Sequence, residues 1–426
     1  MAGFKALKGQ GHTPTLFMAF LYFDMSFMVW TMLGPLSTEI SEALALTGHI
    51  MTAGEKATLL SLPILSGAFL RILLGFGVDK LGAKTTALMA QSVVIAALLT
   101  AYIQGDSITY NQLLIVALGL GFAGASFAVA LPQAGQWYPP KSQGIVLGIA
   151  GAGNIGVVID FLFAPKIAEK WGWEAVFLVG AVMAIVTFIA YAFIAKDAPE
   201  SVYKARPKKL KDYGKLLKDK DSWWFMLFYA ISFGGFVGFA GYMKVYLMNT
   251  YSVDMEAFGI DVFDEPNVKV IAGYFGALTI FAGAVLRPFG GATADKIGGV
   301  KALYFFYGSV AVLVTLLALV KLPFFLSIAV LFFIMASLGM ANGSVFQLVP
   351  QRFGKDIGIM TGIVGAAGGI GGTALIKTLG WSKGAFDGYT IGFLIFASVV
   401  LVAIAGLSVV KTRWRTTWGV NSGGMI

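Results

Sequence analysis

Two arginines stand inside long apolar stretches of this sequence. Arg71 lies in "SGAFLRILLGFGVDKLGAK" (66–84) and Arg287 in "AGAVLRPFGGATADKIGG" (282–299). A guanidinium group stays charged and costs at least ~3 kcal/mol at the centre of a bilayer, so each of these arginines needs a partner. Its planar fork of N–H groups suits an oxyanion. We therefore expect the two arginines to face each other across a bound anion. The alternative is that each pairs with a carboxylate or with backbone carbonyls.

The composition indicates an integral membrane protein. The chain has 426 residues, of which 58% are hydrophobic and 12% charged, and a mean hydropathy of +0.80. Apolar runs of roughly 20 residues, long enough for a helix to cross a bilayer, recur along the whole chain. We predict an all-α membrane protein with twelve transmembrane helices, at approximately 15–36, 57–76, 85–103, 112–136, 143–165, 174–195, 222–248, 269–290, 302–320, 323–347, 357–380 and 389–410.

The residues required by several kinds of chemistry are missing. The chain has no cysteine, which excludes thiol catalysis and disulfides, and its two histidines, His12 and His49, lie outside the predicted spans. The sequence offers no nucleophile–base pair, so it predicts neither an enzyme nor a metal site, and it implies no cofactor. The first apolar run leads directly into further spans, which is not typical of a cleaved signal peptide.

The placement of Lys and Arg predicts the orientation. Most of the basic residues between the predicted spans fall on the side that holds both termini, and such loops stay in the cytoplasm. We therefore expect a multi-pass, monomeric protein of the cytoplasmic (inner) membrane, embedded in the lipid bilayer with both termini cytoplasmic. The net charge of +9 reflects this basic face and not a nucleic-acid partner.

The chain divides into two similar halves. A basic stretch, 196–221, separates 1–195 from 222–426, which ends in a short basic tail; we interpret it as a cytoplasmic linker, with contact to anionic lipid as the alternative. A shift of 216 residues lays eight residues of 66–84, Arg71 among them, on identical residues of 282–299. Such a same-sense repeat predicts two six-helix bundles related by an axis along the membrane normal, with a ligand site between them.

Two glycine-rich stretches form a further echo between the halves, "GIAGAGNIG" (148–156) and "GIVGAAGGIG" (362–371). Glycines on one helix face let helices pack backbone to backbone, and such smooth contacts would also let the bundles rock. The glycines concerned are Gly148, Gly151, Gly153, Gly156, Gly362, Gly365, Gly369 and Gly371. Asn154, in the first stretch, is a polar group in an apolar span, available either to an anion or to a helix–helix hydrogen bond.

A D-K-x-G motif follows each intramembrane arginine. It contains Asp79 and Lys80 in the first half and Asp295 and Lys296 in the second, each with a glycine four residues before the Asp. This resembles the gating-loop motif of the major facilitator superfamily, and the resemblance covers the whole chain. It implies the fold of that superfamily. It says little about the substrate, because this fold carries many different solutes.

With the two arginines, the glycine-rich stretches look like the paired signatures of the nitrate/nitrite porter family, as do "GFAGASFA" (121–128) and "FYAISFGGFVGFAG" (228–241). The resemblance implies a secondary active transporter of nitrate, nitrite or both, working by alternating access. It implies that Arg71 and Arg287 bind the substrate oxygens, and that the other contacts come from Asn154, Tyr229, Phe27, Phe127 and Phe233. Nitrate is planar and weakly hydrated, which is compatible with guanidinium forks and aromatic faces.

Two acids, Asp24 in the first predicted span and Asp160 in the fifth, are candidate proton-binding groups. Two fixed positive charges without a titratable partner favour anion exchange, whereas an acid that binds a proton allows symport. In the family that this chain resembles, the exchangers lack such an acid, so Asp24 favours proton-coupled nitrate symport. Nitrate/nitrite antiport remains open, as does exchange of an organic anion or phosphate ester. The alternative for Asp24 is a static counter-ion or a hydrogen bond that packs helices. The competing class of protein is a membrane sensor on a transporter scaffold.

Overall fold

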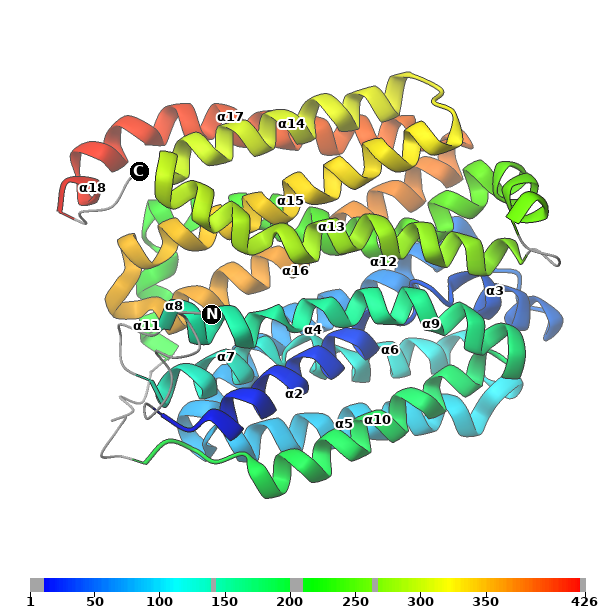
Figure 1. Cartoon of the computed structure of the whole chain (residues 1–426), viewed down its shortest axis with the longest axis horizontal. Helices are drawn as coiled ribbons and strands as arrows, with labels where there is room; N and C mark the ends of the chain where they lie inside the picture. The colour runs from blue at the N-terminus through cyan, green and yellow to red at the C-terminus, as the bar shows by residue number, and fades with distance from the viewer. Residues whose placement is uncertain (1–10, 139–142, 200–209, 263–266, 422–426) are drawn as a thin grey trace.

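The computed structural model describes residues 11–138, 143–199, 210–262 and 267–421. Within these residues the chain is helical, without strands, and eleven helices are long and apolar enough to cross a bilayer. A shorter helix, α2 (Thr13–Thr31), is the twelfth. The all-α class and the twelve-helix arrangement expected from the sequence are confirmed. Figure 1 shows the long helices running side by side along the longest axis of the molecule.

The helices divide between the two halves of the chain. After α2, the first half contains α3 (Ser37–Leu46), α4 (Ala53–Leu81), α5 (Ala83–Gln104), η1 (Gly105–Ser107), α6 (Tyr110–Gly124), α7 (Phe127–Gln136), α8 (Gln143–Gly151), η3 (Ala152–Ile155), α9 (Gly156–Trp171) and α10 (Trp173–Ile194). A short helix, α11 (Leu210–Leu217), precedes the second half. That half contains α12 (Lys220–Val262), α13 (Val268–Ile297), α14 (Gly299–Leu319), α15 (Phe324–Phe353), η4 (Gly354–Asp356), α16 (Ile357–Phe386), α17 (Thr390–Thr416) and α18 (Trp418–Asn421).

The bundle has two distinct ends. The start of α2, the short helix α11 and the C-terminal helix α18 lie together at one end, which we name the terminal end (Figure 1). The short helix α3 lies at the opposite end, named the α3 end. Each long helix runs between these two ends, so a residue in the middle of a long helix lies midway between them.

The D-K-x-G motifs are the ends of helices and not loops. We expected the second and eighth spans to end near residues 76 and 290, but α4 and α13 continue through Asp79 and Lys80 and through Asp295 and Lys296. The helices end where Gly82 and Gly298 take φ of 84° and 95°, a conformation that L side chains avoid. The two repeats therefore fold alike locally, and their glycines fix where each helix stops.

Two predicted spans are interrupted near their middle. The fourth is split into α6 and α7 around Ala125 and Ser126, and the fifth into α8, η3 and α9. The second break falls on the sequence GAGNIG, 151–156, because glycine and asparagine are poor helix formers. The predicted glycine stripe of the fifth span is therefore not one continuous helix face. The seventh span is longer than expected, since α12 continues past a kink at Tyr251 to Val262.

The two halves meet along two pairs of helices, which we name the α4/α16 seam and the α9/α13 seam. In the first, a Cβ at Gly369 would lie 2.7 Å from the Cβ of Ala68, and a Cβ at Gly380 would lie 2.4 Å from that of Ala57. In the second, a Cβ at Gly273 would lie 2.7 Å from the Phe161 carbonyl oxygen. These glycines permit close approach. The contacts at Gly380 and Gly273 lie toward the α3 end, and the contact at Gly369 lies near the middle of the helices.

Toward the terminal end the same helices have fewer neighbours across the seam. A Cβ added at Gly362 of α16 would meet no heavy atom of the described residues within 4 Å. At Gly75 of α4 the nearest such atom is the hydroxyl of Tyr213 in α11, at 3.6 Å, and the Tyr213 ring lies 5.0 Å from that of Phe76. The predicted linker thus contains a helix packed on α4; its residues 200–209 lie outside the described part of the chain.

Candidate functional site

Arg71 projects from the C-terminal part of α4 into a buried site, where only 2% of the residue is exposed. Its Nε donates to the carbonyl of Gly124 at 3.0 Å, and its Nη1 donates to the carbonyl of Gly365 at 2.7 Å. Gly124 is available because α6 ends there, which leaves its last carbonyls without helical partners. Pairing with backbone carbonyls, the alternative to a bound anion, therefore holds for two of the three Arg71 nitrogens. Its Nη2 is buried and has no hydrogen-bond partner among the described residues.

Three aromatic rings surround the Arg71 guanidinium. The centroids of Trp30, Phe127 and Phe233 lie 5.5, 5.7 and 5.2 Å from Cζ. Because Phe233 belongs to α12, in the second half, the Arg71 side chain reaches across both halves of the molecule. Phe27 touches Trp30 and Phe233, with ring centroids 4.9 and 6.3 Å apart, so it supports this layer from behind.

Arg287 occupies the equivalent position on α13 in a more open setting. The residue is half-buried, and its Cζ lies 5.7 Å from the ring centroid of Phe346 in α15. The Tyr229 hydroxyl interacts with the Arg287 guanidinium and with the side chain of Asn342. One nitrogen, Nη1, is buried and has no hydrogen-bond partner among the residues that the structure describes.

The two guanidinium groups share one aromatic site. Their charges repel each other, and both act on the Tyr229 phenol. The Tyr229 ring stacks on Phe233 with centroids 5.1 Å apart and meets Phe346 edge-on at 5.0 Å. Each arginine thus points one unpartnered N–H donor group into buried space, which is costly unless a ligand accepts it. A small oxyanion would satisfy both donors and separate two like charges.

The structure brings together five of the residues that the sequence assigned to substrate binding: Arg71, Arg287, Tyr229, Phe127 and Phe233. Asn154 is buried in η3, where none of the described contacts joins it to either guanidinium. The sequence reasoning missed Trp30, Asn342 and Phe346. For the last two a signal was available, because a lone amide in an apolar span with an aromatic residue four positions later marks one helix face.

Asp24 lies on α2, near the break between η3 and α9. Its carboxylate is within hydrogen-bonding reach of the Gly156 backbone N–H, the first residue of α9, and a helix N-terminus favours an anion. Its Oδ1 is buried and has no partner in the described part of the chain. The preceding residue of α2, Phe23, has its ring 5.6 Å from that of Phe127, so this turn of α2 borders the aromatic site.

Asp160 lies elsewhere, on α9, between the arginine site and the α3 end. It is 4% exposed, and the charge of Lys244 of α12 acts on its carboxyl group. The fully buried Lys244 ammonium bonds to the Pro35 carbonyl at 2.5 Å and to the Glu39 carboxylate at 2.6 Å. Lys244 therefore joins the second half to the first beside the seams. Asp160 belongs to this charged cluster and not to the arginine site.

The glycines of the two glycine-rich stretches, 148–156 and 362–371, differ in what surrounds them. A Cβ at Gly365 would lie 3.3 Å from Arg71 Nη1, and one at Gly371 would lie 2.2 Å from the Ala230 carbonyl oxygen. Gly153 and Gly156 pack on the backbone of α2 beside Asp24 in the same way. Gly151 and Gly362 have open space around them, and Gly148 lies within α8. Close packing is therefore the role of some of these glycines but not of all.

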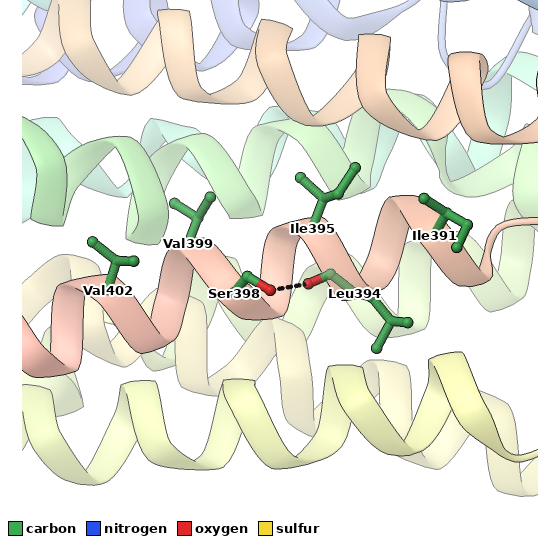
Figure 2. A pocket seen from close by; sticks show the side chains of 6 residues that line it. All are labelled: Ile391, Leu394, Ile395, Ser398, Val399 and Val402. Atoms are coloured by element: carbon green, nitrogen blue, oxygen red, sulfur yellow. Dashed lines mark hydrogen bonds between the residues drawn. The ribbon is translucent and has the colours of Figure 1, made fainter.

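A shallow groove on the surface of α17 is a different feature. It is lined by Ile391, Leu394, Ile395, Ser398, Val399 and Val402. Figure 2 shows that its one hydroxyl, on Ser398, donates to the Leu394 carbonyl of the same helix. The groove therefore offers no polar group to a solute. Within the described residues there is also no cluster of three or more His, Asp or Glu side chains that would hold a metal ion.

Comparison with known proteins gives one consistent result. Residues 15–375 match the Major Facilitator Superfamily. A protein of Mycobacterium tuberculosis (strain H37Rv) named "Probable nitrate/nitrite transporter NarK2" is 30% identical over 401 residues, which cover 92% of this chain and 95% of that protein. The "Nitrite extrusion protein" of Bacillus subtilis is 30% identical over 380 residues, covering 88% and 89%.

A solved structure resembles the whole chain. It is the crystal structure of a bacterial homolog of the human lysosomal transporter Spinster, in an inward-facing and occupied conformation. It matches with a TM-score of 0.68 at 15% identity and covers 93% of this chain and 96% of that one. At this identity the likeness concerns the fold alone.

Proposed function

Because the chain belongs to the Major Facilitator Superfamily, we propose that its paired arginines bind nitrate or nitrite and that the protein carries this anion across the membrane. It is a transporter and not an enzyme. The observation that carries the proposal is the arginine site itself, in which two guanidinium groups keep buried, unpartnered nitrogens among aromatic rings. The names of the relatives, "nitrate/nitrite transporter" and "nitrite extrusion protein", support the same substrates.

Flux of labelled nitrate into proteoliposomes tests this proposal. We expect saturable uptake that unlabelled nitrate and nitrite inhibit and that larger organic anions and phosphate esters do not. The Phe-rich site supports this selectivity, since it offers few polar groups to a larger solute. Binding without flux would indicate a sensor, and strong competition by an organic anion would assign the site to that class.

The orientation and organisation follow from the charges of the loops. The terminal end faces the cytoplasm of a cell whose inner membrane holds the protein, because α11 of the basic linker and the basic end of α17 lie at that end. The segments 1–195 and 222–426 act as two bundles joined by the linker 196–221. One chain carries both arginines, so a monomer suffices. The seams at the α3 end keep the site closed to the outside, and transport requires them to part while the terminal end closes.

A covalent staple across the α4/α16 seam tests this cycle. Ala53 and Gly384 face each other, and a Cβ at Gly384 would lie 3.6 Å from that of Ala53, within the range of a disulfide. The chain has no cysteine of its own, so Ala53→Cys with Gly384→Cys adds the only thiols. We expect oxidation to stop nitrate flux and reduction to restore it, with each single variant unaffected. Unchanged flux in the cross-linked protein would contradict alternating access at this seam.

Proton-coupled symport is the mode that we favour, with Asp24 as the proton-binding group. The residue is partly buried, its Oδ1 has no partner among the described residues, and it lies on the turn of α2 that borders the aromatic site, which supports this role. Asp24→Asn should abolish the stimulation of nitrate uptake by an inward proton gradient but keep nitrate/nitrite exchange, while Asp24→Glu keeps both. The measurement is uptake in vesicles with and without an imposed pH gradient. Unchanged gradient dependence would make Asp24 a static group and leave antiport as the mode.

A further inference from the structure

A lysine of the second half reaches across the α4/α16 seam. Lys377 of α16 is exposed, and its ammonium contacts the hydroxyl of Thr58 in α4. No ion pair to Lys377 occurs within the described residues. Its partner is a neutral group, so the positive charge at this point is not compensated.

The other seam has the same arrangement, with the halves exchanged. Lys166 of α9 is exposed, and its ammonium lies 5.1 Å from the ring centroid of Tyr274 in α13. The shift of 216 residues that lays Arg71 on Arg287 also lays Thr58 on Tyr274. The repeat therefore places a lysine from the opposite half against the same position of α4 and of α13. Again the partner is neutral, a π face.

These lysines lie in line with the arginines. Thr58 precedes Arg71 by 13 residues, and Tyr274 precedes Arg287 by 13. At 1.5 Å per residue each contact lies about 20 Å from the arginine of its own helix, toward the α3 end. The α3 end thus carries a second pair of cations, one on each seam, above the first pair.

Three other lysines at this end bond to carboxylates. Lys244 bonds to Glu39, Lys269 to Glu42, and Lys383 to Asp387, which lies four residues later in the chain. A carboxylate neutralises its lysine, whereas a hydroxyl or a ring face leaves the charge intact and releases the ammonium easily. Lys170 also has a neutral partner, the Trp171 ring 4.9 Å away, but that ring belongs to its own helix. Lys166 and Lys377 differ because their neutral partners lie across a seam, so their charge is available when the seams part.

We propose that Lys166 and Lys377 form an outer capture site for small oxyanions, which holds the anion when the seams are open and passes it to Arg71 and Arg287. The inference rests on the proposed anion transport and adds a second binding step to it. Exposed cations beside a low-dielectric cleft raise the local anion concentration and the rate of encounter, and added salt screens this effect.

The experiment measures nitrate uptake from each side of the membrane, in right-side-out and inside-out vesicles. For Lys166→Gln with Lys377→Gln at low ionic strength, we expect KM for nitrate at the α3 side to rise about fivefold with kcat unchanged. The rise should fall below roughly twofold in 0.5 M potassium gluconate, because salt screens exposed charges. KM at the terminal side should not change. The double Arg variant, which keeps both charges, should behave as wild type.

A matched control lies on the same helix. Lys383→Gln removes a lysine whose charge Asp387 already neutralises, so it should leave KM at the α3 side unchanged. An unchanged KM in the double Gln variant would overturn the capture site, and so would a fall in kcat with KM unchanged at both sides, which would assign the lysines to holding the seams. Absence of nitrate flux in the wild type would instead overturn the proposed function.

Discussion

The two arginines occupy equivalent positions in the repeat but have different surroundings. Arg71 is fully buried, donates to two carbonyls and lies among three aromatic rings. Arg287 is half-buried and lies beside one ring and the Tyr229 hydroxyl. The duplicated stretch of sequence thus fixes where each cation stands. Residues outside that stretch decide how firmly each is held.

The difference indicates that the two arginines have different roles in binding. Arg71 has a preset geometry, since its bonds fix two of its three nitrogens before any anion arrives. One of those bonds, to Gly365, crosses the α4/α16 seam. This bond requires a closed seam, so the position of the Arg71 side chain depends on whether the seam is closed. Arg287 lacks such a backbone clamp among the described contacts and is free to adjust to the anion. Three substitutions test this comparison.

Arg71→Lys should have the largest effect. The ammonium cannot keep both carbonyl bonds and also present a planar fork, and each charged hydrogen bond lost costs about 1.5–3 kcal/mol. We expect kcat/KM for nitrate uptake to fall about 100-fold or more. Initial rates in proteoliposomes over a range of nitrate concentrations measure this. Near-normal uptake would remove Arg71 from the site.

Arg287→Lys should have a smaller effect, about tenfold on kcat/KM, expressed chiefly as a raised KM. The lysine retains charge beside Phe346 and Tyr229 and loses only the forked contact with the anion. The same assay, run in parallel, gives the ratio between the two variants. An effect equal to or larger than that of Arg71→Lys would refute the proposed asymmetry.

Gly365→Ala should have the smallest effect of the three. The added methyl group would lie 3.3 Å from Arg71 Nη1, so the guanidinium has to shift by a few tenths of an ångström. We expect a rise in KM of roughly three- to fivefold, because small displacements weaken preset hydrogen bonds. Gly362→Ala, one turn earlier on α16 and surrounded by open space, is the matched control and should behave as wild type. Equal effects in both variants would disconnect Gly365 from Arg71.

The fold follows from the sequence to a large extent. Long apolar runs predicted twelve membrane helices, and the described residues contain eleven long apolar helices and the shorter α2. Helix ends were less predictable. Asp79 and Asp295 are charged, so hydropathy alone ended the spans too early, whereas the helices stop only at the positive-φ glycines. The break at η3 was not predicted either. Regularly spaced glycines are typical of helix packing, and only the tertiary structure shows that the helix is interrupted there.

The site was predictable where charge made residues conspicuous. An arginine in an apolar span is rare enough to mark itself, so both arginines were found from the residues alone. An aromatic residue alone carries no such mark, since the chain has 35 Phe, and Phe346 was missed because only its spacing from Asn342 distinguishes it. The two hydrogen bonds of Arg71 could not be predicted, because their acceptors are the backbone carbonyls of Gly124 and Gly365. No sequence pattern indicates which backbone carbonyls lie near a side chain.

The glycine-lined seams also affect the rate at which the protein changes conformation. In the cycle that we propose, both must separate and re-form once, so their strength determines how long each conformation persists. Since glycine and alanine have no side-chain rotamers to order, re-closing the seams loses little conformational entropy. Binding and release of the anion should therefore limit the rate of transport, and the movement of the helices should be faster.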